Sequence, residues 1–259
     1  MIDTHAHLTS LDDADEAIRR AVEAGVTRIL TVGTSVEDCR RALVLAERHD
    51  GVFATLGIHP HDAGTATEDD LAALRELLAH PKAVAVGETG LDWFRDYAPR
   101  DTQQRLFAAM LEVAAETRKT AVIHTRAADA DTLAALEDFE GQVVLHCFSS
   151  PHLLDTALER GWYVSFAGNA TFPKAVDLRL SAMQVPANRI LAETDAPYLA
   201  PQPVRGRRNE PAYVLHTLHT LAQARGDDPR QLEAQIERNA AECFGLSTRA
   251  GSTEPEERA

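Results

Sequence analysis

Short apolar runs alternate with longer amphipathic stretches along almost the whole chain. Several of these runs, such as VFATLGI, AVAVG and VVLHCF, are nearly continuous, as expected for strands buried on both faces of a parallel sheet. The predicted strands cover 2–7, 28–33, 52–59, 83–89, 121–125, 142–148, 162–167 and 190–195. Helical patterns fill the intervals between them, and the longest and most regular covers 100–117.

The spacing of these strands indicates the architecture. One strand start follows another after about 27 residues on average, which is the length of a strand plus a crossover helix. Eight such units predict a single (β/α)8 TIM barrel of the α/β class. A doubly wound sheet is the alternative, but the chain contains neither G-x-G-x-x-G nor G-x-x-x-x-G-K-[ST].

The end of the chain departs from this alternation. Two further helices are expected at 209–224 and 229–243, and the sequence leaves open whether they cover the barrel or form an interface. Residues 1–248 are expected to form one domain. Residues 249–259 are expected to be a polar, flexible tail.

Composition narrows the class of protein without identifying a function. The 259 residues are 44% apolar and 25% charged, which is typical of a globular domain. No run of about 18 uncharged apolar residues occurs, so no membrane partner is expected. No signal peptide is visible and the three cysteines are far apart, which favours the cytoplasm. A net charge of −14 disfavours non-specific duplex binding, but bound cations can still attract a small anion.

Six nitrogen or oxygen donors stand at the carboxyl ends of predicted strands. They are His5 and His7 on the first strand, Glu88 on the fourth, His124 on the fifth, His146 on the sixth and Asp195 on the eighth. The H-x-H spacing puts the first pair on one face of its strand. A barrel builds its active site at this end, and buried carboxylates without partners cost several kcal/mol each. The pattern therefore predicts a divalent metal centre.

Other side chains at the same rim are candidates for supporting roles. Arg126 is the first choice for a phosphate contact, because a guanidinium matches phosphate geometry. Arg207, next to Arg208, is a second choice, and a solvated loop position explains it equally well. His61 in GIHPH is a candidate for substrate binding and His59 a weaker one, the alternative being loop stabilisation. Asp92 is expected to orient a ligand histidine.

Aromatic residues also follow the predicted strands at this end. Trp93, Phe94 and Tyr198 would be placed to stack on a nucleobase. Packing within the loops explains them equally well at this stage.

Seven segments in this order resemble the TatD-type metal-dependent hydrolases, a deoxyribonuclease branch of the amidohydrolase-like barrels. The segments are DTHAHL (3–8), LGIHPH (56–61), GETGLD (87–92), IHTR (123–126), HCFS (146–149), ETDAPYLAP (193–201) and RGRRNEP (205–211). The resemblance spans nearly the whole chain and implies a (β/α)8 barrel with a dinuclear metal centre.

The resemblance also implies roles for the six donors. His5, His7 and Asp195 would hold one metal ion, His124 and His146 would hold the other, and Glu88 would bridge the two ions. Related barrels use a carboxylated lysine as the bridge. Here Lys82 precedes its strand, which favours the glutamate.

The function implied is a divalent-metal-dependent phosphodiesterase that activates water, with Asp195 and Glu88 as catalytic residues. A 3′-5′ exonuclease acting on ends of single-stranded DNA is the favoured form, with two ions of Zn, Mn or Mg per chain. A hydrolase of a small ester, amide or lactone is the first alternative. A metal-binding interaction module without activity is the second. Cleavage polarity, DNA or RNA preference and oligomeric state stay open.

Overall fold

A computed structural model describes residues 1–95 and 97–247 and confirms the predicted barrel. All strands run parallel and pair in sequence order from β1 to β8. The strands are β1 (Ile2–Ala6), β2 (Arg28–Gly33), β3 (Val52–Leu56), β4 (Ala83–Asp92), β5 (Thr120–Arg126), β6 (Val143–Leu145), β7 (Tyr163–Phe166) and β8 (Ile190–Ala192).

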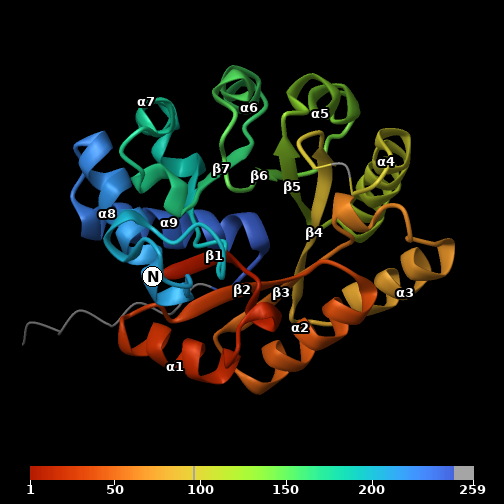
Figure 1. Ribbon diagram of the computed structural model, residues 1–259, viewed down its shortest axis with the longest axis horizontal. Helices are drawn as coiled ribbons and strands as arrows, with labels where there is room; N and C mark the ends of the chain where they lie inside the picture. Colours follow the sequence, from red (N-terminus) through yellow and green to blue (C-terminus); the bar gives the residue numbers. More distant parts are fainter. Residues whose placement is uncertain (96, 248–259) are drawn as a thin grey trace, which may run out of the picture.

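Helices form an outer ring around the strands, and the last helix lies behind the strands in this view (Figure 1). They are α1 (Ala14–Glu23), α2 (Val36–Arg48), α3 (Glu68–Leu78), α4 (Arg100–Thr117), α5 (Asp129–Ala135), α6 (Leu154–Glu159), α7 (Val176–Gln184), α8 (Val214–Arg225) and α9 (Pro229–Phe244). Within the described ranges, the search for a helix long and apolar enough to cross a bilayer finds none.

Local sequence explains where several of these elements begin and end. The first three long helices start after Asp13, Ser35 and Thr67, whose side chains accept a hydrogen bond from a backbone amide in the first turn. All six residues of β2 are buried, Arg28 and Thr31 included, as expected for a strand covered on both faces. The first three crossover helices therefore have fixed starts around a largely buried sheet.

Two strands each carry one extra residue near the barrel mouth. In β4, Gly87 pairs with Val122 and Thr89 pairs with Ile123, so that Glu88 is the additional residue. The register of β1 against β2 shifts in the same way between Asp3 and Ala6. An extra residue of this kind bends a strand and turns a side chain in a new direction. In β4 the turned side chain is that of Glu88.

Two glycines allow β4 to adopt this shape. Gly87 has φ +149° and Gly90 has φ +140°, in a region that side-chain-bearing residues rarely occupy. A Cβ atom on Gly90 would also overlap the carbonyl oxygen of His124 on β5. The G-E-T-G sequence is thus required by backbone geometry on either side of Glu88.

The barrel closes between β8 and β1 through few but specific contacts. Asp195 N donates to His5 O at 2.9 Å and His7 N donates to Ala196 O at 2.7 Å. Deeper in the seam, the Asp3 carboxylate accepts from the backbone N and the hydroxyl of Thr194 at 2.9 and 2.6 Å. Burial raises the pKa of Asp3 to about 8. Closure therefore brings the ends of the first and last strands into contact.

The last helix, α9, covers the end of the barrel opposite the mouth. The amino group of Met1, before β1, lies 2.8 Å from Glu233 of α9. Asn239 of α9 donates to the carbonyl of Ile190 at the start of β8 at 2.7 Å. Thr120, at the start of β5, donates to a carbonyl near the end of α9. These contacts answer for α9 what the sequence left open, because the helix caps the floor of the barrel.

Several predicted strand boundaries differ from those in the structure. The sixth and eighth strands span only Val143–Leu145 and Ile190–Ala192, so that His146 and Asp195 lie just beyond them. The fourth strand continues to Asp92, three residues further than expected. The predicted tail at 249–259 lies outside the described residues, and the boundary at 248 stays a prediction.

Replacing Gly90 with alanine should destabilise the fold. The added methyl group must displace a strand carbonyl and occupy an unfavourable φ, so we expect a loss of about 2–5 kcal/mol. For a chain of this length, that loss lowers Tm by about 5–15 °C. Differential scanning calorimetry measures the change. Gly64→Ala is the control, since its Cβ would meet only the Ala98 methyl at 3.8 Å. Equal Tm values for both variants would contradict the bulge argument.

Candidate metal centre

Five of the six predicted donors line a cavity at the carboxyl ends of the strands, and the sixth, His5, has its Nε2 atom 3.3 Å from that of His7. The volume of this cavity is about 950 Å³, and it is lined by side chains from loops and strands distributed around the mouth. We call His5, His7, Glu88, His124, His146 and Asp195 the donor cluster. All six residues predicted as ligands are brought together here, although the sequence separates them by up to 190 positions.

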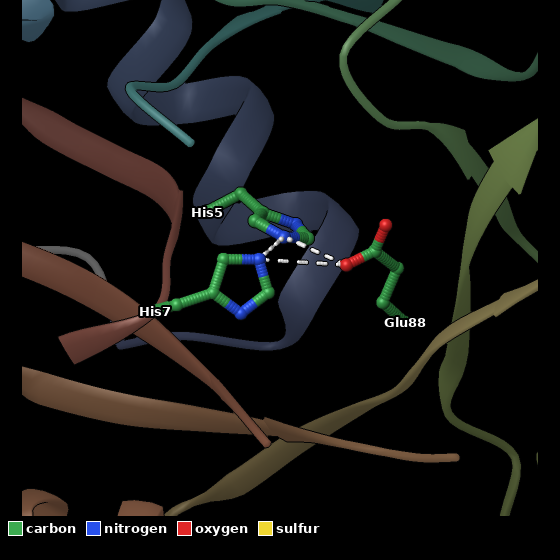
Figure 2. A group of neighbouring side chains, drawn as sticks. All are labelled: His5, His7 and Glu88. Carbon is green, nitrogen blue, oxygen red and sulfur yellow. Dashed lines mark hydrogen bonds and ion pairs between the residues drawn. The ribbon is translucent and has the colours of Figure 1, made fainter. Parts of the chain in front are cut away.

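One oxygen of Glu88 faces the imidazoles of His5 in β1 and of His7 just after it. Glu88 Oε2 lies 3.4 Å from His5 Nε2 and 3.6 Å from His7 Nε2, and the two nitrogens are 3.3 Å apart. Figure 2 shows the three side chains pointing toward one another from the end of β1 and from β4. Asp195 Oδ1 completes the group at 3.4 Å from His7 Nε2 and 3.9 Å from His5 Nε2.

These separations fit a small divalent cation. A tetrahedral ion with bonds of about 2.0–2.1 Å keeps neighbouring donors roughly 3.3–3.4 Å apart. The four closest of the five measured separations in this group, 3.3 to 3.6 Å, match that spacing, and they exceed a usual hydrogen-bond length. Two imidazoles and two carboxylates also form a donor set suited to borderline divalent metals. The residues present therefore fit a metal ion.

The other oxygen of Glu88 faces a second set of imidazoles. Glu88 Oε1 lies 2.7 Å from His124 Nδ1, 3.1 Å from His146 Nε2 and 3.4 Å from His59 Nε2. A single carboxylate thus contacts histidines on opposite sides. His59, which the sequence made only a weaker candidate for substrate binding, forms a group with His124 and Glu88 that is close enough to hold an ion.

Neighbouring histidines keep the buried carboxylate of Glu88 ionised. Burial alone would raise the pKa of Glu88, but the charges of His146 and His59 and hydrogen bonds from His124 and His146 hold it well below its usual value. Burial would likewise lower the pKa of His146, yet the carboxylates of Glu193 and Glu88 raise it well above the ordinary value. The cluster therefore contains opposite charges that compensate one another.

His5 and His7 differ in their electrostatic surroundings. Burial, followed by the charge of His146, lowers the pKa of His5 and favours its neutral form, which is the form that binds metals. For His7 the burial effect is outweighed by the carboxylates of Asp195 and Glu88, which raise its pKa. His5 is thus ready to donate a lone pair.

Glu193 holds the ring of His146, a role that the sequence analysis missed. Its Oε1 lies 2.7 Å from His146 Nδ1 and accepts from Cys147 N at 2.8 Å, and its Oε2 accepts from the hydroxyl of Ser165 at 2.5 Å. A carboxylate on the far nitrogen of a ligand histidine fixes the ring and its tautomer. The available sequence signal for Glu193 was its position in E-T-D, two residues before Asp195.

The carboxylate of Asp92 lies between the imidazoles of His124 and His61. Its Oδ2 is 3.3 Å from His124 Nε2 and 2.8 Å from His61 Nε2, and its Oδ1 accepts from the amides of Phe94 and Arg95 at 2.9 Å each. Hydrogen bonds from the two imidazoles lower its pKa against the opposing effect of burial. This carboxylate joins a donor histidine to the loop that follows β4.

The remaining predicted side chains separate into two groups. Arg126 and His61 line the cavity together with Arg95 and Tyr97, which the sequence analysis did not name. Within the described part of the chain, Arg207 is not among the lining residues, and its substrate role stays a prediction.

A parallel (β/α)8 barrel with a carboxylate and histidine cluster at its mouth defines a metal-dependent hydrolase of the amidohydrolase-like class. A sequence profile described as TatD related DNase matches residues 2–245. The chain belongs to this family, as its motifs predicted, and it is a metal-dependent hydrolase of the nuclease type.

Individual relatives agree with this assignment over their full lengths. The 3′-5′ ssDNA/RNA exonuclease TatD of Cronobacter sakazakii is 38% identical over 256 residues, covering 94% of this chain and 97% of that protein. The uncharacterized metal-dependent hydrolase YabD of Bacillus subtilis is 35% identical over 254 residues, covering 95% and 100%. The structure of YJJV, a TatD homolog from Escherichia coli K12, superposes with TM-score 0.90 at 28% identity, covering 95% and 98%.

Replacing Glu193 with glutamine should weaken metal binding while leaving every member of the donor cluster in place. Removing this outer carboxylate leaves the His146 ring less firmly oriented, and we expect affinity for Zn²⁺ or Mn²⁺ to fall by about 10- to 100-fold. Isothermal titration calorimetry measures the change.

Glu47→Gln is the matched control for this experiment. Glu47 lies 3.1 Å from His80 Nε2 and is half-exposed, so it forms a similar pair away from the mouth. Unchanged metal affinity in Glu193→Gln, with the fold intact, would rule out the positioning role.

Proposed function

We propose that this chain removes nucleotides from the 3′ end of single-stranded nucleic acid, with two divalent ions at the donor cluster. The supporting observation is that the two oxygens of Glu88 face separate sets of imidazoles, at 3.4 and 3.6 Å on one side and 2.7 and 3.1 Å on the other. The relative named a 3′-5′ ssDNA/RNA exonuclease supports both the substrate and the polarity.

Each set of donors would hold one ion. His5, His7 and Asp195 would hold the first ion, His124 and His146 would hold the second, and Glu88 would give one oxygen to each. When bound, the ions would supply positive charge that polarises a phosphate oxygen and lowers the pKa of a water molecule.

The chain's own groups would then manage the proton and the phosphate. Asp195 is buried at the mouth with its pKa lowered by the neighbouring imidazoles, so it is ionised and able to accept a proton from water. Arg126 is exposed at the rim and would donate to non-bridging phosphate oxygens through its planar guanidinium. Glu193 and Asp92 would keep the imidazoles of His146 and His124 oriented throughout.

The charge at the mouth favours a strand end over a long duplex. Apart from histidines, Arg95 and Arg126 are the cationic side chains among the described residues that line the cavity. Duplex binding proteins neutralise many phosphates with an extended basic surface. Two arginines beside a metal centre instead suit a phosphodiester that is inserted at its end.

Glu88→Gln should abolish nuclease activity. The substitution keeps the size of the side chain and removes the charge shared by both sets of imidazoles, so we expect kcat on single-stranded DNA to fall by at least about 10³-fold. The assay follows release of labelled nucleotides with Mg²⁺, Mn²⁺ or Zn²⁺, with and without a chelator. Label at the 3′ end should be released before label at the 5′ end.

The same variant controls for contaminating nucleases, because wild type and variant are purified identically. Residual cleavage of equal rate in both would contradict the proposal. Turnover of a simple ester or lactone by the wild type, with intact DNA, would assign the site to a different substrate.

Arg126→Lys should raise KM for single-stranded DNA. Lysine keeps the charge and loses the two-pronged donor geometry, and a lost charged hydrogen bond corresponds to about a 10- to 100-fold weaker interaction. Steady-state kinetics on a short oligonucleotide measure this value. Arg207→Lys serves for comparison, and an equal effect of both variants would argue against a special role of Arg126.

A further inference from the structure

We propose that Phe94, Tyr97 and Tyr198 form a surface on which nucleobases stack while the terminal phosphodiester reaches the donor cluster. We call these three residues the aromatic rim. The inference rests on the proposed function and deepens it, because it assigns the part of the site that recognises bases rather than phosphates.

The distribution of exposed aromatic side chains carries the argument. The chain has eight Phe, four Tyr and two Trp residues. Among the described residues, the large aromatic side chains that are exposed are Phe94, Tyr97 and Tyr198, at 60, 63 and 56%. All three lie in the loops after β4 and β8, at the mouth of the barrel. Exposed apolar groups that gather at one functional opening indicate a binding surface.

Each ring of the aromatic rim lies against a polar partner at the cavity. The guanidinium of Arg126 lies over the ring of Phe94 at 3.9 Å from its centroid. Tyr97 meets His61 edge to face, with centroids 4.7 Å apart. Tyr198 meets His7 of the donor cluster in the same way at 5.8 Å. Bases stacked on these rings would therefore lie beside the place where the phosphodiester is held.

Trp93 shows what an aromatic residue looks like when its loop position serves packing instead. Its Nε1 donates to Asp131 at 2.7 Å, and Arg100 lies over its ring at 4.9 Å. The ring also packs against the hydrophobic core. Its neighbour Phe94 is mostly exposed, so the two residues serve different purposes.

The chemistry of the aromatic rim selects unpaired bases. Aromatic side chains stack on any base, and arginine on an aromatic ring adds an electrostatic attraction. A base can lie flat on such a ring only after it has left its own stack. Rings from two loops that both border the donor cluster would separate neighbouring bases of a strand end, and a duplex end would have to fray first.

Kinetics with two substrates test the inference. Phe94→Leu and Tyr198→Leu should each raise KM for a single-stranded hexanucleotide by about 5- to 50-fold and leave kcat within about twofold. The second substrate has the same phosphodiesters but lacks bases at its last three positions. On this abasic strand, wild type and variants should have equal kcat/KM. Equal losses on both substrates would overturn the proposal.

Matched variants separate stacking from simple loss of bulk. Phe94→Tyr and Tyr198→Phe keep a ring and should retain the KM of the wild type. Val44→Ala removes an exposed apolar group from α2, away from the mouth, and should change nothing. A rise in KM for the ring-preserving variants equal to that for the leucine variants would also overturn the proposal.

A binding experiment without catalysis distinguishes this inference from the proposed function. A hexanucleotide with 2-aminopurine at its 3′ end is titrated with protein in a chelator, and stacking should quench its fluorescence. Quenching by the wild type and at least about fivefold weaker binding to Tyr198→Leu support the aromatic rim even if no metal yields cleavage. Wild-type cleavage without quenching, or quenching unchanged in both leucine variants, would remove the aromatic rim and leave the nuclease assignment standing.

Discussion

The buried carboxylate of Glu88 is the interaction on which the rest of this site depends. A negative charge inside a barrel is costly unless cations or donors surround it on every side. Here imidazoles from β1, β5 and the segments after β1, β3 and β6 provide that surrounding, at 2.7 to 3.6 Å. The same charge that would destabilise an empty pocket draws these distant segments together and prepares them for divalent ions.

The backbone is shaped around that carboxylate at some cost to regular strand geometry. β4 gains one residue at Glu88, flanked by glycines that no other residue could replace without strain. β1 gains one residue between Asp3 and Ala6, and its end is joined to the segment after β8 through Asp195 and Ala196. Irregular pairing is not confined to the mouth, because β4 also shifts register against β3 between Ala83 and Ala85, but the bulge at Glu88 is at the mouth and places a member of the donor cluster.

Much of this organisation can be predicted from the chain, and the exceptions have physical reasons. Apolar runs ending in His5, His124 or Glu88 predict a strand and a candidate metal ligand together, because the polar residue stands at the carboxyl end of the run. The role of Glu193 could not be predicted from the sequence, since it depends on which nitrogen of His146 faces the carboxylate in space. The exposure of Tyr97 and the packing of Trp93 depend on how one loop folds back, which no residue pattern in that loop records.

The position of α9 across the base of the barrel affects how a ligand can enter and leave the cavity. Met1, Thr120 and Ile190 are all bonded to that helix, so α9 covers the base of the barrel in the part of the chain that the structure describes. A ligand that enters the cavity at the mouth therefore does not leave through the base of the barrel. A polymer that reaches the donor cluster through the mouth would not continue through the barrel. A released fragment and the remaining strand would therefore share the mouth.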